Sequence, residues 1–314
     1  MRRLILLVVL YLIVMLSCWG TPDPESHSEK KRPNVVLYVI DTLRADRLGV
    51  YGGAAEKPLV RTSPNIDEFA SSGIVFEQAV APAPWTLPSM ASVFLSQFPC
   101  EHGLLNDGDR LSDGKTLASA LSELGYRTGA FYENPYVGAM SKLDQGYKKS
   151  LLIGTGEVEP IDAWLDAQDP NSPFFLYVHT VEPHNPESAK NIDVIDEVRE
   201  EVELAYRSYR NLTRVDYEKG LALGTTDNTE EQQKALDKLN SIQDTVSLLY
   251  DAAVLDADSR FGYLWKRLKK DGFQENTLFV LVSDHGEELG DRGGWQHDHS
   301  VYEELIHVPL IIRL

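Results

Sequence analysis

The chain has 314 residues, of which 48 are acidic and 30 basic, so it carries a formal net charge of −18 and has an isoelectric point near 4.8. A hydrophobic fraction of 43% excludes a wholly disordered chain and is enough for one large α/β domain or two ordinary ones. Nucleic-acid-binding proteins normally carry a basic stripe or patch, so this acidic composition argues against a nucleic-acid partner.

The first twenty residues have the features of a leader. An apolar run from Leu4 to Leu16 follows two arginines; it is short for a membrane span and suited to a signal sequence. The tetrapeptide MLSC, which ends at Cys18, resembles a bacterial lipoprotein cleavage site. We expect removal of the leader (1–20) and lipid attachment to Cys18, with an uncleaved anchor as the alternative. Both predict an extracytoplasmic, membrane-anchored domain, in the periplasm or on the cell surface, joined by a polar tether over 21–32.

Alternating apolar and amphipathic segments after residue 33 predict an α/β fold, a three-layer αβα sandwich around a mostly parallel sheet. Runs of β-branched and large apolar residues are typical of strands that are buried on both faces. We expect strands at 34–40, 74–79, 127–132, 173–179, 278–282 and 308–314, and helices at 64–72, from 88 onward, at 117–124, 160–167 and 230–270.

Three further features concern organisation. The stretch from about 186 to 241 is acidic and interrupted by Gly and Thr, so we predict an insertion there within a catalytic domain that spans 33–314. The chain ends on the apolar strand 308–314, and because a core strand needs further packing we expect a truncated C-terminus. Cys100 is the one cysteine after Cys18, so it has no internal disulfide partner, and we expect it to be a buried thiol.

Two of the expected strands end on a carboxylate. The first is followed by Asp41, and the strand at 278–282 is followed by Ser283, Asp284 and His285. Open parallel sheets bind ligands at the carboxyl ends of their strands, so Asp41 and Asp284 are expected at one edge although they lie far apart in sequence. Two acids and a histidine at one edge predict a metal site.

Four segments carry these and other reactive residues, at 34–46, 83–90, 173–184 and 283–303. In this order they resemble the sulfatase branch of the alkaline phosphatase superfamily, and the resemblance runs from about residue 33 to 314. The family pattern Cys/Ser-x-Pro-Ser-Arg at the nucleophile aligns with TLPSM, which begins at Thr86. The resemblance implies an alkaline-phosphatase-like fold and a metal-dependent hydrolase or transferase that acts on phosphate or sulfate esters, possibly glycan-linked or lipid-linked. It implies one divalent metal ion held by Asp41, Thr86, Asp284 and His285.

Elementary chemistry agrees with this alignment. Thr86 is expected at the start of a helix entered through Pro88, where free N–H groups and the positive end of the helix dipole favour an anion. A hydroxyl coordinated to a divalent metal becomes a competent nucleophile despite its high intrinsic pKa. Three oxygens and one imidazole suit Mn²⁺, Mg²⁺, Ca²⁺ or Zn²⁺, and the mixed set favours Mn²⁺ or Zn²⁺ over Ca²⁺.

The sequence departs from the family pattern at three positions. Thr86 has no thiol, which argues against the formylglycine mechanism of true sulfatases and resembles the phosphoglycerol transferases that build lipoteichoic acid. Asp41 is followed by Thr42 instead of a second acid, and Met90 replaces the arginine of the motif. These changes leave a competing hypothesis open: a degenerate, non-catalytic family member that binds anionic glycans or lipids. A sulfatase that uses another nucleophile is a third possibility.

Histidines are the expected partners of the leaving group. His179, His184, His297 and His299 fall in two short segments that the family folds toward the metal. We expect His184 and His299 to contact the substrate anion or to donate a proton to the leaving group. His297 is a candidate for a supporting role beside the metal or for a second metal.

Overall fold

The computed structural model describes residues 31–53, 61–190, 200–205 and 230–314. The predicted leader, Cys18 and the tether up to residue 30 lie outside the described residues, as does most of the predicted insertion at 186–241. Within the described ranges, none of the helices combines the length and apolar character that crossing a membrane requires.

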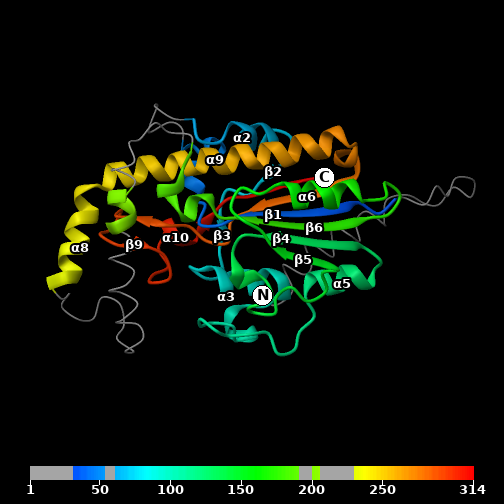
Figure 1. The fold of residues 1–314 in the computed structure, drawn as a ribbon, viewed down its shortest axis with the longest axis horizontal. Helices are drawn as coiled ribbons and strands as arrows, with labels where there is room; N and C mark the ends of the chain where they lie inside the picture. The colour runs from blue at the N-terminus through cyan, green and yellow to red at the C-terminus, as the bar shows by residue number, and fades with distance from the viewer. Residues whose placement is uncertain (1–30, 54–60, 191–199, 206–229) are drawn as a thin grey trace, which may run out of the picture.

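A seven-stranded, mostly parallel sheet forms the middle of the molecule (Figure 1). Its strand order is β2-β11-β7-β1-β6-β4-β5. The parallel strands are β1 (Asn34–Ile40), β4 (Arg127–Tyr132), β5 (Lys149–Leu152), β6 (Phe174–Thr180) and β7 (Thr277–Val282). Strand β11 (Leu310–Arg313) runs antiparallel to β7, and β2 (Ile74–Val75) runs antiparallel to β11. The α/β, mostly parallel prediction is confirmed.

Two details of the sheet differ from the sequence-based expectation. The strand expected at 74–79 is divided into β2 and β3 (Ala79–Val80), and β3 leaves the main sheet to pair with β10 (His307–Val308). Strand β5 was not predicted; its partly exposed residues at the edge of the sheet do not form the apolar run by which the other parallel strands were identified. A separate small pair is formed by β8 (Glu288–Leu289) and β9 (Trp295–Gln296).

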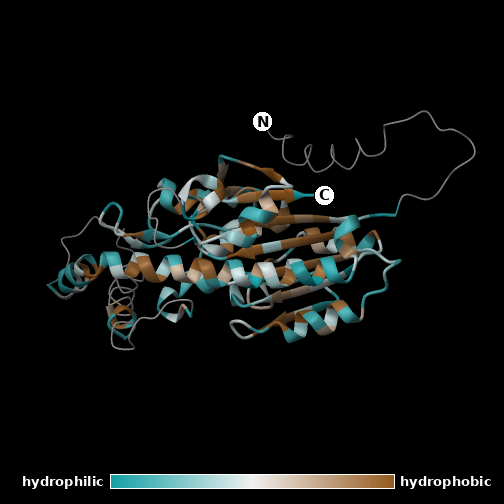
Figure 2. Ribbon diagram, turned by 90° about the horizontal axis from the view of Figure 1, so that it is seen from above, coloured by the Kyte–Doolittle hydropathy of each residue, from teal (hydrophilic) through white to brown (hydrophobic). Residues whose placement is uncertain are grey.

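Helices cover both faces of the sheet, which confirms the three layers. One face packs against α2 (Pro64–Ala70), α6 (Glu159–Asp166) and α9 (Gln243–Lys270), and the other packs against α3 (Thr86–Leu95) and α5 (Leu117–Glu123). Figure 2 shows the long helix α9 lying across the strands. Two short helices, α4 (Pro99–His102) and α10 (Glu303–Ile306), lie in connections. The prediction that Cys100 is buried was wrong: it is exposed, because it lies on the four-residue α4, which connects larger elements and has no buried residue.

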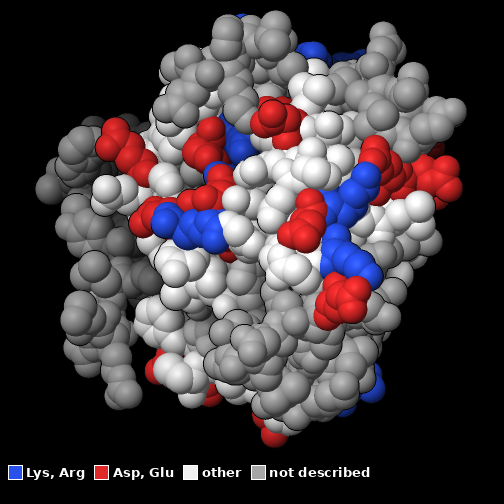
Figure 3. Space-filling view, turned by 90° about the vertical axis from the view of Figure 1, so that its left-hand side faces the viewer, with Lys and Arg blue, Asp and Glu red and all other residues white. Residues whose placement is uncertain are grey.

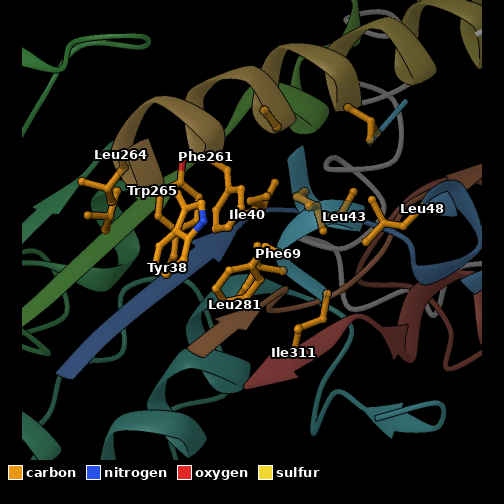
Figure 4. Close-up of a cluster of buried hydrophobic side chains, with 14 of the residues drawn as sticks. Tyr38, Ile40, Leu43, Leu48, Phe69, Phe261, Leu264, Trp265, Leu281 and Ile311 are labelled. Atoms are coloured by element: carbon orange, nitrogen blue, oxygen red, sulfur yellow. The ribbon is translucent and has the colours of Figure 1, made fainter. Parts of the chain in front are cut away.

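Alternation along β1 explains how the two faces are filled. Tyr38 belongs to the apolar cluster beneath α9, whereas its neighbours Leu37 and Val39 belong to the cluster on the α3 side, as the two-residue period of a strand requires. In the first cluster the ring of Phe261 meets those of Tyr38 at 5.5 Å and Phe69 at 5.2 Å, both edge to face (Figure 4). Burial of these aromatic side chains fixes α9 on the sheet.

The helix expected at 230–270 consists of two helices. Helix α8 (Glu230–Ser241) ends one residue before α9 begins, and Ile242 between them has φ −117° and ψ 17°, outside the helical region. Helix α9 has fifteen buried residues that follow the sheet. Figure 1 shows α8 turning away from the line of α9 beyond the sheet. Leu239 of α8 still belongs to the apolar cluster beneath α9, so the helix is divided although the apolar packing continues across the break.

Strand register brings the functional segments to one edge. Val39 of β1 pairs with Val282 of β7, and Ile40 pairs with Thr180 of β6. Since these strands are parallel, the residues that follow them emerge at the same end of the sheet. This end is the carboxyl edge, where α/β folds bind their ligands.

Candidate metal centre

Four side-chain atoms from three separate parts of the chain converge at this edge. Nε2 of His285 lies 3.3 Å from Oγ1 of Thr86, 3.5 Å from Oδ1 of Asp41 and 3.4 Å from Oδ2 of Asp284. All four residues are buried, with at most 3% of the surface of each exposed. The structure therefore brings together the four residues that the sequence predicted as metal ligands.

The two carboxylates are held by their outer oxygens. Oδ2 of Asp41 accepts a hydrogen bond from Nδ2 of Asn134 at 2.7 Å and lies 3.2 Å from Nε2 of His179. Oδ1 of Asp284 accepts from the backbone N–H of His285 at 2.9 Å and of Thr42 at 3.3 Å. Thr42 has φ 58°, a left-handed conformation that is costly for a β-branched residue and that recurs at functional sites. The outer contacts thus direct the remaining oxygens inward.

The imidazole of His285 is oriented in the same way. Its Nδ1 lies 2.9 Å from the backbone oxygen of Gly286, so it is placed to donate its N–H to that carbonyl. The tautomer that makes this bond leaves a lone pair on Nε2, which faces the two carboxylates and Thr86. Metal-binding histidines are commonly fixed by such a bond from the second ring nitrogen.

The donor set fits a divalent cation. Oδ1 of Asp41 and Oδ2 of Asp284 are buried and have no hydrogen-bond partner among the described residues, although buried polar atoms are nearly always paired. Donor atoms about 3.4 Å apart are expected around one small cation bound at about 2.1 Å. Asp41 and Asp284 also form, with His179, a buried group whose possible ligand atoms all lie within 4.8 Å of one another. His179 is therefore a further candidate ligand.

The electrostatics of the site follow from this crowding. Burial, and then the charge of Asp41, raise the pKa of Asp284, because two carboxylates this close disfavour each other's ionisation. Burial alone would also raise the pKa of Asp41, but the hydrogen bond to His179 and the charges of nearby imidazoles outweigh it and lower that pKa. Burial and the adjacent His297 lower the pKa of His285 to about 3. Without a cation, the site therefore disfavours the ionisation of both carboxylates at once.

Helix α3 presents Thr86 as its first residue, with Trp85 preceding it in extended conformation. Its hydroxyl oxygen also accepts a hydrogen bond from Nδ2 of Asn134 at 3.1 Å, so this single amide group joins Thr86 to Asp41. Asn134 was not predicted. It follows the strand at 127–132 by two residues, so the strand-end rule that identified Asp41 was available for it as well. Met90, which replaces the arginine of the family motif, is fully buried and contributes to the apolar cluster on the α3 side.

The candidate proton donors have different surroundings in the structure. The ring of His297 lies 4.6 Å from that of His285 and 5.2 Å from that of His184, so His297 and His184 adjoin the site. Burial alone would lower the pKa of His297, but the carboxylate of Glu287, 3.2 Å away, raises it to about 9. His299 instead directs Nε2 to Glu288 at 2.7 Å, and its role as a proton donor stays a prediction.

Positive and negative side chains are mixed on the surface of the domain. On the face shown in Figure 3, Lys and Arg side chains are interspersed with Asp and Glu.

Comparisons with known proteins place this geometry in context. The family model described as Sulfatase matches residues 33–156 and 157–314. An N-acetylglucosamine-6-O-sulfatase of Bacteroides thetaiotaomicron is 23% identical over 385 aligned residues, which cover 98% of this chain and 67% of that protein. The chain thus spans about two thirds of the length of this relative.

Two solved structures share the fold. The phosphonate monoester hydrolase of Agrobacterium radiobacter superposes with a TM-score of 0.63 at 20% identity, over 90% of this chain and 68% of that one. The zinc complex of the C-terminal periplasmic domain of EcEptC from Escherichia coli superposes with a TM-score of 0.62 at 16% identity, over 92% of this chain and 74% of that one. These likenesses confirm the alkaline-phosphatase-like fold that the sequence predicted.

Proposed function

The chain belongs to the sulfatase family, and from this premise we propose that it is a metal-dependent hydrolase or transferase of phosphate or sulfate esters with Thr86 as its nucleophile. The relatives and structural neighbours support ester hydrolysis of the sulfatase kind. The observation that carries the proposal is the convergence of Thr86, Asp41 and Asp284 on Nε2 of His285, with one oxygen of each carboxylate left without a hydrogen-bond partner.

Asp41, Thr86, Asp284 and His285 would hold the divalent cation, with His179 beside them. Such a cation supplies Lewis-acid chemistry: it lowers the pKa of a bound hydroxyl and neutralises charge that develops on an ester oxygen. The mixed oxygen and nitrogen set is compatible with Mn²⁺, Mg²⁺, Ca²⁺ or Zn²⁺. The structural neighbour solved as a zinc complex adds weight to Zn²⁺.

The chain's own groups orient the nucleophile. Oγ1 of Thr86 attacks the phosphorus or sulfur atom, its proton passes to a basic group of the site, and the bond to the leaving alcohol breaks. Nδ2 of Asn134 donates to Oγ1, so it stabilises negative charge on that oxygen as the proton departs. The first turn of α3 adds the backbone N–H groups of Thr86 and Leu87, which can face an anion at the start of the helix. Pro88, the third residue of the helix, has no N–H to add.

The leaving alcohol takes a proton from a histidine. We assign this role to His184 and His299, as the sequence predicts, and the structure adds His297, which lies against both His184 and His285. Water or an acceptor alcohol then attacks the covalent Thr86 ester. Release to water makes the protein a hydrolase, and release to an alcohol makes it a transferase.

The nucleophile and the names of the relatives support our proposal for the substrate class. The name of the Bacteroides relative specifies a 6-O-sulfated sugar, and that of the Agrobacterium neighbour specifies phosphonate monoesters. Thr86 has no thiol to oxidise, which disfavours the formylglycine mechanism. We therefore favour phosphate esters of a glycan or a lipid, in the branch that resembles phosphoglycerol transferases, over sulfate esters.

Metal depletion tests the proposal. The full chain is stripped with EDTA and assayed on an aryl sulfate, an aryl phosphate and an aryl phosphodiester before and after addition of Mn²⁺ or Zn²⁺, with bound metal measured by mass spectrometry. Turnover should be lost on stripping and restored by metal. Asp284→Asn should lose both metal and turnover. Asp258→Asn, which alters an equally buried carboxylate on α9, should keep both.

The same experiment separates the alternatives. Turnover that survives stripping, or that is unchanged in Asp284→Asn, contradicts the metal-dependent mechanism. A degenerate binding protein would turn over none of the three substrates in any metal. A sulfatase with another nucleophile would hydrolyse the aryl sulfate and keep that activity when Thr86 is replaced by Ala.

We also propose that the domain is extracytoplasmic and membrane-anchored. The apolar run from Leu4 to Leu16 and the MLSC segment support this placement. Mass spectrometry of the mature protein should find a diacylated N-terminal Cys18. Cys18→Ala should then release the domain from the membrane fraction, or leave it attached if the leader remains uncleaved.

A further inference from the structure

One buried guanidinium joins two loops of the catalytic edge. Arg260 lies on α9, and only 9% of its side chain is exposed. Its Nη1 donates to a carboxylate oxygen of Glu133, in the loop after β4, and to Oε1 of Glu182, in the turn after β6, at 3.0 Å. Its Nη2 donates to the backbone oxygen of Glu157 at 2.8 Å. The planar fork of an arginine makes such a multiple attachment possible.

Glu133 extends this attachment into the backbone. Its Oε2 accepts from the N–H of Val181 at 3.1 Å, and its Oε1 accepts from the N–H of Gly156 at 2.9 Å. The side chain is 1% exposed. The Glu133 carboxylate is bonded to the backbone after β5 and to the backbone after β6, and Glu133 itself follows β4. A change in its position therefore moves these three loops together.

Each anchored carboxylate is adjacent to a site residue. Asn134, whose amide bonds to Asp41 and Thr86, directly follows Glu133. His184 ends the single 3₁₀ turn that begins at Glu182. We infer that Arg260 is a positioning residue: by holding Glu133 and Glu182 it sets Asn134 and His184 relative to each other. The catalytic part of this inference rests on the proposed function.

The physical reason is the low tolerance of a preorganised site. Removing the guanidinium leaves two buried carboxylates facing each other without a cation, which drives them apart. Since Asn134 and His184 follow those carboxylates by one and two residues, both shift. A displacement of about 1 Å in a site of this kind can lower the rate by about 10²-fold.

The test compares Arg260→Met with Arg267→Met in the full, metal-loaded chain. Arg267 is a matched control, because it lies on the same helix, is 16% exposed and forms ion pairs with Asp162, Asp166 and Asp271. Arg260→Met should lower kcat by about 10²-fold, with KM and bound metal little changed. Arg267→Met should stay within twofold of the wild type. Arg260→Lys should recover only part of the rate, because one ammonium does not reproduce the fork.

A second measurement does not need activity. Hydrogen exchange of the Val181 and Gly156 amides and the NMR signals of the Asn134 side-chain amide and the His184 ring should change in Arg260→Met and stay unchanged in Arg267→Met. If the wild type proves inactive, the proposed function fails while these signals still decide whether Arg260 sets the loops. Unchanged signals, or a kcat within twofold of the wild type, overturn the inference. If Arg260→Met does not fold, Glu182→Gln loosens the Glu182 attachment alone and should alter the His184 signal without altering that of Asn134.

Discussion

The hydroxyl oxygen of Thr86 lies 3.3 Å from Nε2 of His285, although 199 residues separate them in the chain. Thr86 begins α3 on one face of the sheet, and His285 follows β7 within it. The sheet edge alone brings them together. Because the contact joins a candidate nucleophile to a candidate metal ligand, it yields a direct prediction about Thr86.

Thr86→Ala should lower kcat by at least about 10³-fold, because it removes the attacking oxygen. Thr86→Ser keeps the hydroxyl and should retain turnover within about tenfold of the wild type, since only a methyl group is lost. The measurement is steady-state kinetics on the best aryl ester, with bound metal determined in parallel.

Thr116→Ala is the matched control for this change. Thr116 is also a buried threonine at the start of a helix, where its hydroxyl accepts from the N–H of Ser119 at 3.1 Å. It should cost about 1 kcal/mol of stability as a lost helix cap and leave kcat unchanged. Equal activity in Thr86→Ala and the wild type would remove Thr86 from the mechanism.

Asp284→Asn should separate metal binding from folding. The pKa of Asp284 is raised by burial and then by the charge of Asp41, so in the stripped protein the variant removes a buried charge and its repulsion with Asp41. The variant can still accept hydrogen bonds through its amide oxygen from the backbone N–H groups of Thr42 and His285. Its melting temperature in EDTA should therefore match or exceed that of the wild type. Metal at 100 times its Kd should stabilise the wild type by about 2.7 kcal/mol and leave the variant unchanged.

Thermal unfolding with and without metal checks this prediction. Asp258→Asn is again the control, since Asp258 is buried on α9 and accepts from the N–H of Ile66 at 2.8 Å. It should destabilise the stripped protein and respond to metal as the wild type does. A stripped Asp284→Asn that melts well below the wild type would show that Asp284 serves the fold instead of a cation.

The predicted ligands lie close together because the prediction depends on backbone topology: residues that follow adjacent parallel strands lie at the same edge of the sheet. Strands β1 and β7 are adjacent and parallel, so Asp41 and Asp284 must emerge together whatever the intervening chain does. The same rule places Asn134 after β4, but a single asparagine beside a proline also reads as an ordinary turn, so it was missed. His179 ends the strand expected at 173–179, but it was named only among the histidines near the metal and not as a ligand; in the structure it is the last residue but one of β6.

The remaining differences reflect tertiary contacts that a linear pattern does not contain. His297 and His299 are two residues apart, but in the structure His297 contacts Glu287 and adjoins His285, whereas His299 contacts Glu288. Apolar spacing continues through Ile242, and both Ile242 and Leu239 pack on the cluster beneath α9, yet the backbone leaves the helical region at Ile242. Local periodicity predicts that this segment is helical but does not show where the backbone divides it into two helices.

The ion pair between Arg44 and Asp291 gives a pH-dependent prediction. Burial alone would raise the pKa of Asp291, but the hydrogen-bonded guanidinium of Arg44, 2.7 Å away, outweighs it and lowers that pKa. An acid whose pKa is lower in the folded state binds protons more readily when unfolded. Its stabilising contribution is therefore complete above the unfolded pKa near 3.8 and is lost as the pH falls through the folded value.

Asp291→Asn should consequently be less stable than the wild type at pH 7, and the difference should shrink as the pH is lowered below about 4. Urea unfolding of both proteins across this range measures the convergence. Asp113→Asn, a change at an exposed loop position, should show no comparable trend. A difference that widens toward acid would contradict the assigned direction of the pKa shift.

The aromatic cluster beneath α9 yields the largest expected loss of stability. Phe261 is fully buried, and its ring contacts those of Tyr38, Phe69 and Phe279 at 5.5, 5.2 and 5.7 Å. Phe261→Ala should lower the free energy of unfolding by about 3–5 kcal/mol, because it removes buried apolar surface and leaves a cavity. Leu248→Ala lies on the same helix at a position that is 40% exposed and should cost less than about 1 kcal/mol. Chemical unfolding of both variants measures the two losses, and equal losses would mean that α9 is not held to the sheet by this cluster.

Because Arg260 adjoins Phe261 on α9, loosening the helix should also lower kcat in Phe261→Ala, under conditions in which the variant is still folded.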